Sequence, residues 1–426
     1  MSFWLAILGI VLLALFGAPL FTIIGALALY GFSSIGTDAS AVIIELYRIA
    51  DSPPLVAIPL FTFAGYMLAE SNSPKRLVQV TQALLGWLPG GLAVVVLIVC
   101  AFFTAFTGAS GVTIVALGGL LYPILLKEHY PEQFSLGLVT ASGSIGLLFP
   151  PSLPIILYGL ISAVSIDQLF VAGFIPGVVL LGLVGIYSVR TGVRSNLQTI
   201  KFSWGNVYSA VKAAGWELPL PVIIIGGIYG GAFTATEAAA ITAFYVLVVE
   251  VFIYRDLNLF KDVPRVMKES MLLVGAILAI VGTAFGLTNY LIDQQVPQKL
   301  FELVQARISS QVTFLLILNG FLLIVGMMMD IFSAIIVVVP LILPIAREFH
   351  VDPVHLGIIF LTNLEIGYLT PPVGLNLFLS SLRFKKSIFH ITKAVFVFIV
   401  LELIALVLIT YVPELSLWLV GALGTR

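Results

Sequence analysis

The sequence predicts an all-α polytopic membrane protein made of two inverted-topology repeats, each with a re-entrant hairpin and a broken helix. Three observations predict this fold: the composition, the distribution of charged residues and an internal repeat. Of the 426 residues, 60% are hydrophobic and 10% are charged. Soluble domains are typically about 45–50% apolar and about 25% charged, so a soluble protein is excluded.

Long stretches of the chain contain no Asp, Glu, Lys or Arg, namely 2–37, 77–126 and 134–166. At about 1.5 Å per residue, a helix over the first stretch would be roughly 54 Å long, well beyond the ~30 Å hydrocarbon core. Each stretch must therefore hold more than one membrane segment. Strands of outer-membrane barrels alternate in polarity, whereas 91–105 is apolar throughout, so helices are expected. The first apolar segment, 3–16, lacks a basic leader and is predicted to be a retained span.

An internal repeat relates the two halves of the chain. The string Ile145–Pro151 (IGLLFPP) recurs as Ile366–Pro372 (IGYLTPP), identical at five of seven positions and 221 residues later. The same offset relates Pro123 to Pro344 and Gly65 to Gly286. Because proline and glycine determine where a helix breaks, this register predicts two halves with matching breaks. Such duplicated halves are typical of transporters built from inverted repeats.

The most polar internal stretch, around 190–212, separates the halves. We predict a first repeat over 1–190, a polar linker over 191–215 and a second repeat over 216–426. Lys and Arg also gather in 255–268 and 383–393, and this excess favours a cytoplasmic position for all three basic stretches.

The residues around each Pro-Pro pair suit ions and carboxylates. A Pro-Pro pair removes two N–H donors and leaves carbonyls one turn earlier without helical partners. In hydrocarbon each unsatisfied polar group costs several kcal/mol, so such a break requires polar side chains, water or a cation. Carbonyl and hydroxyl oxygens suit hard cations such as sodium, and the N–H groups at helix starts suit carboxylates. The flanking polar residues are Ser142, Ser144 and Ser152 in one half, and Asn363, Glu365, Thr370 and Asn376 in the other.

A probable hairpin tip precedes each break. The first, Phe106–Thr113, is rich in small and hydroxyl residues, and the second, Gly326–Ser333, contains Asp330. An ionisable residue between long apolar segments predicts a functional role, and the alternative is that Asp330 caps a hairpin helix. Glu237 follows Thr234 at a helix start, where a carboxylate stabilises the helix dipole, so a structural role and a site role both stay open. The same two readings apply to Glu365.

Several function classes are disfavoured by what the sequence lacks. Cys100 is the only cysteine, and the four histidines have no partner at metal-binding spacing. No phosphate-binding Gly-x-x-x-x-Gly-Lys-Ser/Thr motif is present, so ATP is not expected to drive this chain. With 20 basic and 21 acidic residues, a nucleic-acid surface is not supported.

These motifs resemble the large membrane subunit of tripartite ATP-independent periplasmic (TRAP) transporters over essentially the whole chain. The stretches that carry the resemblance are 142–154, 158–159, 170–177, 226–231, 236–240, 352–357, Asn363 and 370–378. The first tip departs from the family in one respect, since Ala109 stands where many members have serine.

The resemblance implies an ion-transporter-superfamily elevator fold in the bacterial inner membrane and sodium-coupled import of an organic acid. The implied partners are a small four-helix membrane subunit, a periplasmic substrate-binding protein, the organic acid and the lipid bilayer, with no nucleic acid and no ATPase. Sodium ions are implied as coupling ions, bound mostly by backbone carbonyls. The implied sodium residues are Gly108, Gly146, Phe149 and Pro151 in one half, with Gly367, Thr370 and Pro372 in the other. The implied substrate contacts are Ser110, Ser152, Asp330 and Asn376.

Two alternatives remain open from the sequence. One is a stand-alone sodium or proton symporter for divalent organic anions, which shares the two-hairpin architecture. The other is an intramembrane enzyme acting on lipid or peptide, and its weakness is that no catalytic set stands at usable spacing. We therefore predict a transporter and not an enzyme. The identity of the acid is not predicted, because selection in the family rests largely on the binding protein.

Overall fold

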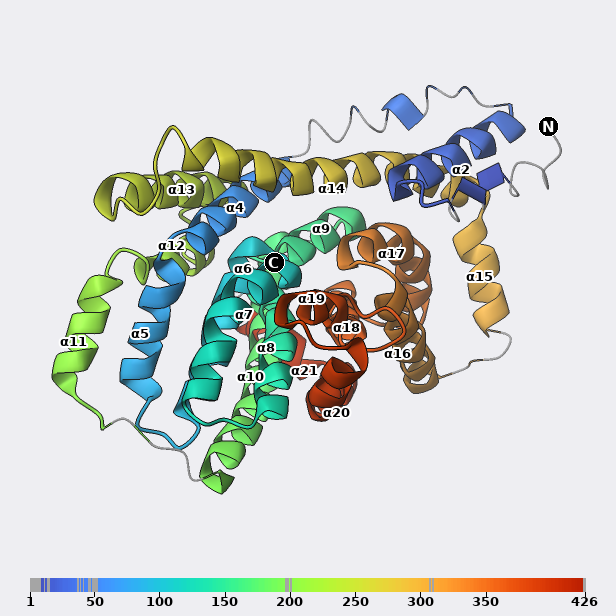
Figure 1. Ribbon diagram of the computed structural model, residues 1–426. Coiled ribbons are helices and arrows are strands. Elements are labelled where there is room, and N and C mark those ends of the chain that lie inside the picture. The colour runs from blue at the N-terminus through green and yellow to red at the C-terminus, as the bar shows by residue number, and fades with distance from the viewer. Residues whose placement is uncertain are drawn as a thin grey trace.

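A computed structural model gives the fold of the chain (Figure 1). It describes residues 9–10, 12–13, 16–36, 38, 40, 42–44, 47, 53–195, 199, 201–305, 308 and 310–423. Within these ranges the regular secondary structure is helical and no strand occurs. Most of the apolar segment 3–16, predicted to be a retained span, lies outside the described residues.

The first half contributes a hairpin, a broken helix and a long helix to the centre of the molecule. These elements are α6 (Gly91–Thr107), α7 (Ser110–Lys127), α8 (Glu132–Ile145), the short 3₁₀ turn η1 (Gly146–Leu148), α9 (Leu153–Ser162) and α10 (Ile166–Arg194). The two arms of the broken helix meet at an angle of 42°. The break follows from the sequence, because Pro150 and Pro151 cannot donate the hydrogen bonds that would continue α8.

The second half repeats this arrangement. Its elements are α16 (Gln311–Met328), α17 (Ile331–Glu348), α18 (Pro353–Gly367), α19 (Leu375–Phe384) and α20 (Ile388–Tyr411). The hairpin helices α7 and α17 begin 221 residues apart, and so do α8 and α18. This spacing equals the offset of the sequence repeat, so equivalent residues adopt equivalent structure in the two halves.

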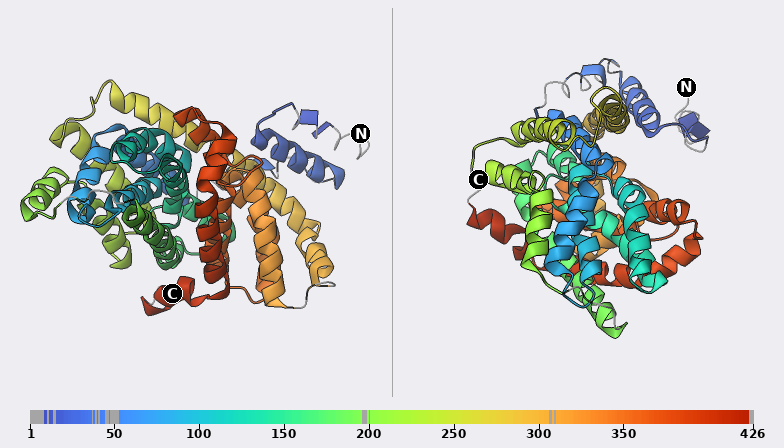
Figure 2. Two further views of the ribbon diagram at one scale, coloured as in Figure 1. Left: turned by 60° about the horizontal axis from the view of Figure 1, so that its bottom comes forward. Right: turned by 60° about the vertical axis from the view of Figure 1, so that its left-hand side comes forward.

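The remaining helices surround this central group. They are α2 (Leu20–Ser34), α4 (Pro53–Glu70), α5 (Ser73–Leu85), α11 (Trp204–Ala213), α12 (Pro219–Tyr229), α13 (Ala235–Val248) with a π-helical turn η2 (Val249–Ile253), α14 (Asp262–Asp293), α15 (Val296–Gln305) and α21 (Glu414–Ala422). Helices α13, α14 and α2 lie along one side of the central group, and α4 packs against both α13 and α14 (Figures 1 and 2).

Seven of the described helices are long and apolar enough to cross a membrane, or eight if the broken helix α8–α9 counts as one span. The α-helical polytopic fold with hairpins and broken helices is thus confirmed. The predicted linker 191–215 contains the end of α10 and the short helix α11. The boundaries of the two repeats stay a prediction.

Candidate functional site

The tip of the first hairpin is a two-residue turn between α6 and α7. Gly108 ends α6 with φ +64°, the left-handed region that favours glycine, and a Cβ there would lie 2.3 Å from Leu153 Cγ. Ala109 precedes the first turn of α7, and no side chain caps that helix start. The first N–H groups of α7 therefore face the tip without a side-chain acceptor, which is the arrangement that attracts an anion.

The tip of the second hairpin differs in charge. Asp330 is the N-cap of α17, and its carboxylate accepts hydrogen bonds from the Ser333 backbone N–H (3.0 Å) and the Ser333 hydroxyl. The Ile331 N–H donates to the Tyr368 hydroxyl at 2.6 Å. The structural reading of Asp330 as a helix cap is therefore confirmed. Because Asp330 is also exposed at the tip, a second role in contacting a ligand stays a prediction.

The first break packs tightly against the hairpin beside it. A Cβ on Gly146 would lie 2.3 Å from the Ala101 carbonyl oxygen, so only glycine fits where α8 ends. The Thr104 hydroxyl lies 2.7 Å from the Thr113 hydroxyl and donates to the Gly143 carbonyl at 2.9 Å. These contacts fix the end of α8 against both arms of the hairpin.

The second break has the matching contact. A Cβ on Gly367 would lie 2.4 Å from the carbonyl carbon of Gly326, near the end of α16. The Thr370 hydroxyl donates to the Ile366 carbonyl at 2.8 Å, and the Gly374 N–H donates to the Met327 carbonyl at 3.2 Å. The Pro150–Pro151 and Pro371–Pro372 peptide bonds are both cis.

The two halves cross over at the tips. The hydroxyl of Ser110, at the start of α7, donates to Asn376 Oδ1 in α19 at 2.7 Å, and both side chains are buried. The Asn376 Nδ2 atom has no partner among the described residues. The hydroxyls of Thr140 and Ser380 lie 2.8 Å apart in the same interface. Each half thus completes polar groups that belong to the other.

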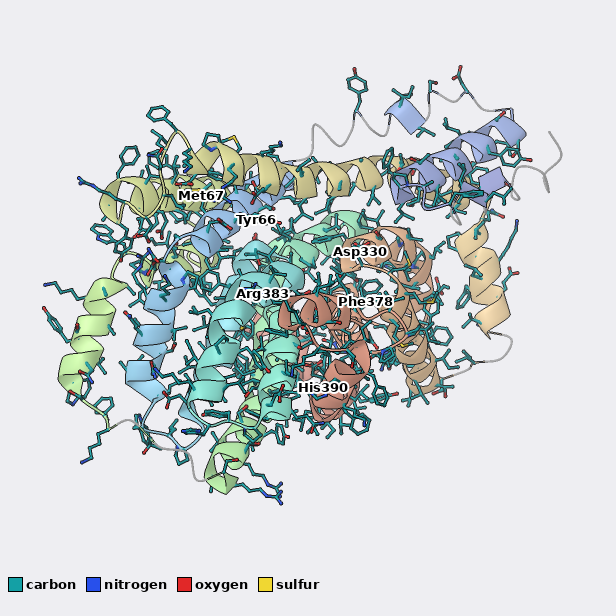
Figure 3. The ribbon with its side chains drawn as sticks, viewed as in Figure 1. Tyr66, Met67, Asp330, Phe378, Arg383 and His390 are labelled. Carbon is teal, nitrogen blue, oxygen red and sulfur yellow. The ribbon has the colours of Figure 1, made fainter. Side chains whose placement is uncertain are left out.

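A cavity of about 560 Å³ opens between the two tips and the surrounding helices. Its walls include 108–112 from the first tip, 330–332 from the second, Tyr368 beside the second break, and residues of α4 and α14. Tyr66 on α4 and Asp330 at the start of α17 are labelled in Figure 3. A volume of this size suits a small organic ligand.

Two carboxylates in the cavity wall were not expected from the sequence. Glu70, at the end of α4, and Glu269, in α14, both line it. Arg265 Nη2 lies 2.7 Å from Glu70 Oε2, and Arg265 Nη1 lies 3.4 Å from Glu269 Oε1. No motif brings 70 and 269 together in the sequence, because they become neighbours only through the packing of α4 on α14.

The structure brings some of the predicted site residues together and separates others. Gly108, Ser110 and Asp330 line the cavity, and Asn376 contacts it through Ser110. Ser152 is fully buried at the start of α9, and its hydroxyl has no partner among the described residues. The side chain of Phe149 lines a different, apolar pocket of about 180 Å³. The roles of all these residues stay predictions.

The predicted sodium residues lie at the two breaks, one turn away from the tips. Gly146 accepts a hydrogen bond from the Phe149 N–H at 3.1 Å, and Gly367 accepts one from the Thr370 N–H at 3.0 Å. Pro151 and Pro372 follow in the turns that lead to α9 and α19. The two predicted sets therefore occupy equivalent places in the halves.

Other polar residues singled out in the sequence have clear surroundings. Glu237 forms a reciprocal capping box with Thr234, so its structural reading is confirmed. Glu365 is 2% exposed and does not line the cavity, and one of its carboxylate oxygens has no partner among the described residues. No metal-binding group of His, Cys, Asp or Glu occurs within the described ranges.

Comparison with known proteins gives a consistent result. The family model described as "Tripartite ATP-independent periplasmic transporter, DctM component" matches residues 6–415. The chain is 35% identical to a C4-dicarboxylate TRAP transporter large permease protein of Rhodobacter capsulatus, over 97% of this chain and 98% of that protein. It is 34% identical to an isethionate TRAP transporter permease protein of Oleidesulfovibrio alaskensis, over 97% of this chain and 70% of that protein.

A solved structure supports the fold. The Alcanivorax borkumensis YdaH transporter superposes with a TM-score of 0.65, covering 90% of this chain and 88% of that chain at 14% sequence identity. At this identity the likeness concerns the fold alone.

Proposed function

The chain belongs to the DctM component family of the tripartite ATP-independent periplasmic transporters, and from this membership we propose that it imports an organic acid together with sodium ions. A periplasmic binding protein delivers the acid, and a small four-helix membrane subunit completes the complex. As a member of this family the chain is a multi-pass protein of the bacterial inner membrane.

The observation that carries the proposal is the cavity between the two hairpin tips. The first turn of α7, from Ser110 onward, presents N–H groups that no side chain caps. A substrate carboxylate binds there, where the helix dipole and the Ser110 hydroxyl both favour negative charge. The first turn of α17 is already occupied by the Asp330 carboxylate. The anionic end of the substrate therefore binds at the first tip.

Sodium binds at the two breaks. Helices α8 and α18 end where Pro-Pro pairs prevent continuation, so carbonyl oxygens near Gly146 and Gly367 lack the usual helical donors. Such oxygens suit a hard cation. Because each break touches its hairpin through a glycine contact, a bound ion orders the tip that contacts the substrate. This contact is the physical basis for coupling.

An elevator movement fits the arrangement of the helices. The hairpins and broken helices of both halves pack into one central group through contacts such as α7 with α19 and α9 with α17. Helices α4 and α14 contribute the opposite wall of the cavity. Movement of the central group along α4 and α14 carries the cavity from one side of the membrane to the other.

The test is uptake into proteoliposomes that contain this chain, its small partner subunit and the binding protein. Labelled succinate and isethionate are suitable probes, because relatives carry a C4-dicarboxylate and isethionate in their names. We expect uptake that requires both an inward sodium gradient and the binding protein. Uptake that persists without either component would refute the tripartite sodium-coupled mechanism.

A further inference from the structure

A second cavity, of about 590 Å³, lies outside the candidate site. It is formed by the start of α8, the last turns of α10 and the first turns of α20. Figure 3 labels His390, in the first turn of α20. We refer to this feature as the basic cavity because Arg190, Arg194 and Lys393 line it.

The charge of the basic cavity is not neutralised by its own walls. Among the described residues that line it, none is acidic. Glu132 is adjacent in sequence to the lining residue Gln133, but its carboxylate lies 2.5 Å from Lys386 Nζ. Three cationic side chains thus converge on a space large enough for a ligand, with no carboxylate between them. Arg and Lys in such a cluster select phosphate oxygens.

The floor of the basic cavity is apolar and closely packed. The rings of Phe134 and Tyr187 lie 5.7 Å apart, and both contact Phe398 at 5.9 and 5.5 Å. A Cβ on Gly137 would lie 2.2 Å from the Ala394 carbonyl oxygen, so α8 and α20 are already in contact. The cavity therefore has firm walls.

The cavity lies at the ends of two strongly apolar helices. The most apolar windows of α10 and α20 have mean hydropathies of 2.5 and 2.7, and both helices are candidate spans. Basic residues at the ends of such helices lie at the membrane–water boundary. The apolar side chains of Ile186 and Phe396, exposed by 69% and 64%, continue from the cavity toward the hydrocarbon.

We propose that the basic cavity binds the headgroup phosphate of an anionic phospholipid. Arg190, Arg194 and Lys393 contact the phosphate, and the acyl chains follow the exposed apolar faces of α10 and α20. A lipid fits better than a free phosphate, because the cavity combines a cationic wall with an apolar surface at the level of the headgroups. The site is separate from the transport cavity, so the proposal does not depend on which substrate the chain carries.

The experiment measures lipid binding to the full chain in detergent by native mass spectrometry. The probes are dioctanoyl phosphatidylglycerol, dioctanoyl phosphatidylcholine and inorganic phosphate. The test variant carries R190Q, R194Q and K393Q. A matched control carries K212Q, K261Q and K268Q, which remove the same charge from exposed positions outside the cavity. Thermal unfolding of both variants verifies that they are folded.

We expect phosphatidylglycerol to bind the native chain in preference to phosphatidylcholine. Each basic residue near an anionic headgroup is worth about fivefold in affinity, so the test variant should lose about a hundredfold. The control variant should keep the native affinity. Equal loss in both variants, no preference over phosphatidylcholine, or displacement of the lipid by inorganic phosphate at similar concentration would each overturn the proposal. Should the test variant fail to fold, R194Q alone is compared with K212Q alone, with about fivefold loss expected only for R194Q.

Discussion

Replacing Arg76 with methionine should destabilise the protein far more than replacing Arg265 in the same way. Arg76, in α5, lies in a buried cluster of carboxylates that joins α5 to the start of α12 and the end of η2. Its Nε donates to Glu217 Oε1 at 2.7 Å, Nη1 lies 2.7 Å from Asp256 Oδ2, and Nη2 lies 3.1 Å from Glu250 Oε2. The guanidinium carbon also lies 3.8 Å from the centre of the Tyr254 ring.

The electrostatics of this cluster follow from burial and pairing. Burial by itself would lower the pKa of Arg76, but hydrogen bonds and charge from Glu217 and Asp256 raise it above its ordinary value. Burial raises the pKa of Glu217 despite its bond to Arg76. For Asp256, burial opposes ionisation, but hydrogen bonds from Asn72 and Arg76 lower its pKa. The carboxylates thus depend on one cation.

The magnitude follows from exposure. The side chains of Glu217 and Glu250 are fully buried, and removing one partner from a buried ion pair costs about 3–5 kcal/mol. Arg265 also contacts carboxylates, those of Glu70 and Glu269, but these side chains are 40% and 44% exposed. Exposed pairs are worth about 0.2–1 kcal/mol. Methionine keeps much of the apolar stem in both variants, so the difference reports mainly the charge.

The assay uses Cys100, the only cysteine, which is buried in α6. A thiol-reactive dye labels it only when the protein opens, so the dye follows thermal or denaturant unfolding in detergent. We expect Arg76→Met to lower the free energy of unfolding by about 3–5 kcal/mol and Arg265→Met by less than about 1 kcal/mol. Equal effects of the two substitutions would refute the reasoning that the cluster is a buried structural contact.

Further predictions concern the tips and the breaks. Gly146→Ala and Gly367→Ala should each destabilise the protein by about 1–3 kcal/mol and abolish uptake, because a Cβ would lie 2.3 and 2.4 Å from backbone atoms. Gly275→Ala, with open space around it, is the control and should leave the unfolding transition nearly unchanged. Asp330→Asn keeps a side chain that caps α17, so stability should stay within about 0.5 kcal/mol while uptake falls at least tenfold; full uptake would leave Asp330 as a cap alone. Ser110→Ala should raise the KM for the acid and destabilise the fold by about 1 kcal/mol, since Asn376 loses its hydrogen-bond donor; an unchanged KM would contradict carboxylate binding at the first tip.

Much of the fold could be predicted because its breaks are encoded locally. The Pro-Pro pairs, the glycines in register and the long uncharged stretches each constrain the backbone wherever the chain folds. The starts of α7 and α17 therefore differ by the same 221 residues as the sequence repeat. The angle of 42° at the first break could not be predicted, because it depends on how α8 and α9 pack.

The candidate site was predictable only in part, for a physical reason. Ser110 and Asp330 lie at hairpin tips that the sequence marks with small or charged residues, and both line the cavity. Glu70 and Glu269 also line it, but they meet through the packing of α4 on α14 and have no local signature. Similarly, the hydrogen bond from Ser110 to Asn376 joins residues 266 positions apart. Such pairs follow from tertiary structure and not from spacing.

The most direct test of the central claim measures the entry of sodium-22 and of labelled acid in the same proteoliposomes containing the complete complex. The account predicts sodium entry that depends on the acid, requires the binding protein, and falls with acid uptake in Gly367→Ala. Acid uptake without any acid-dependent sodium entry would contradict it.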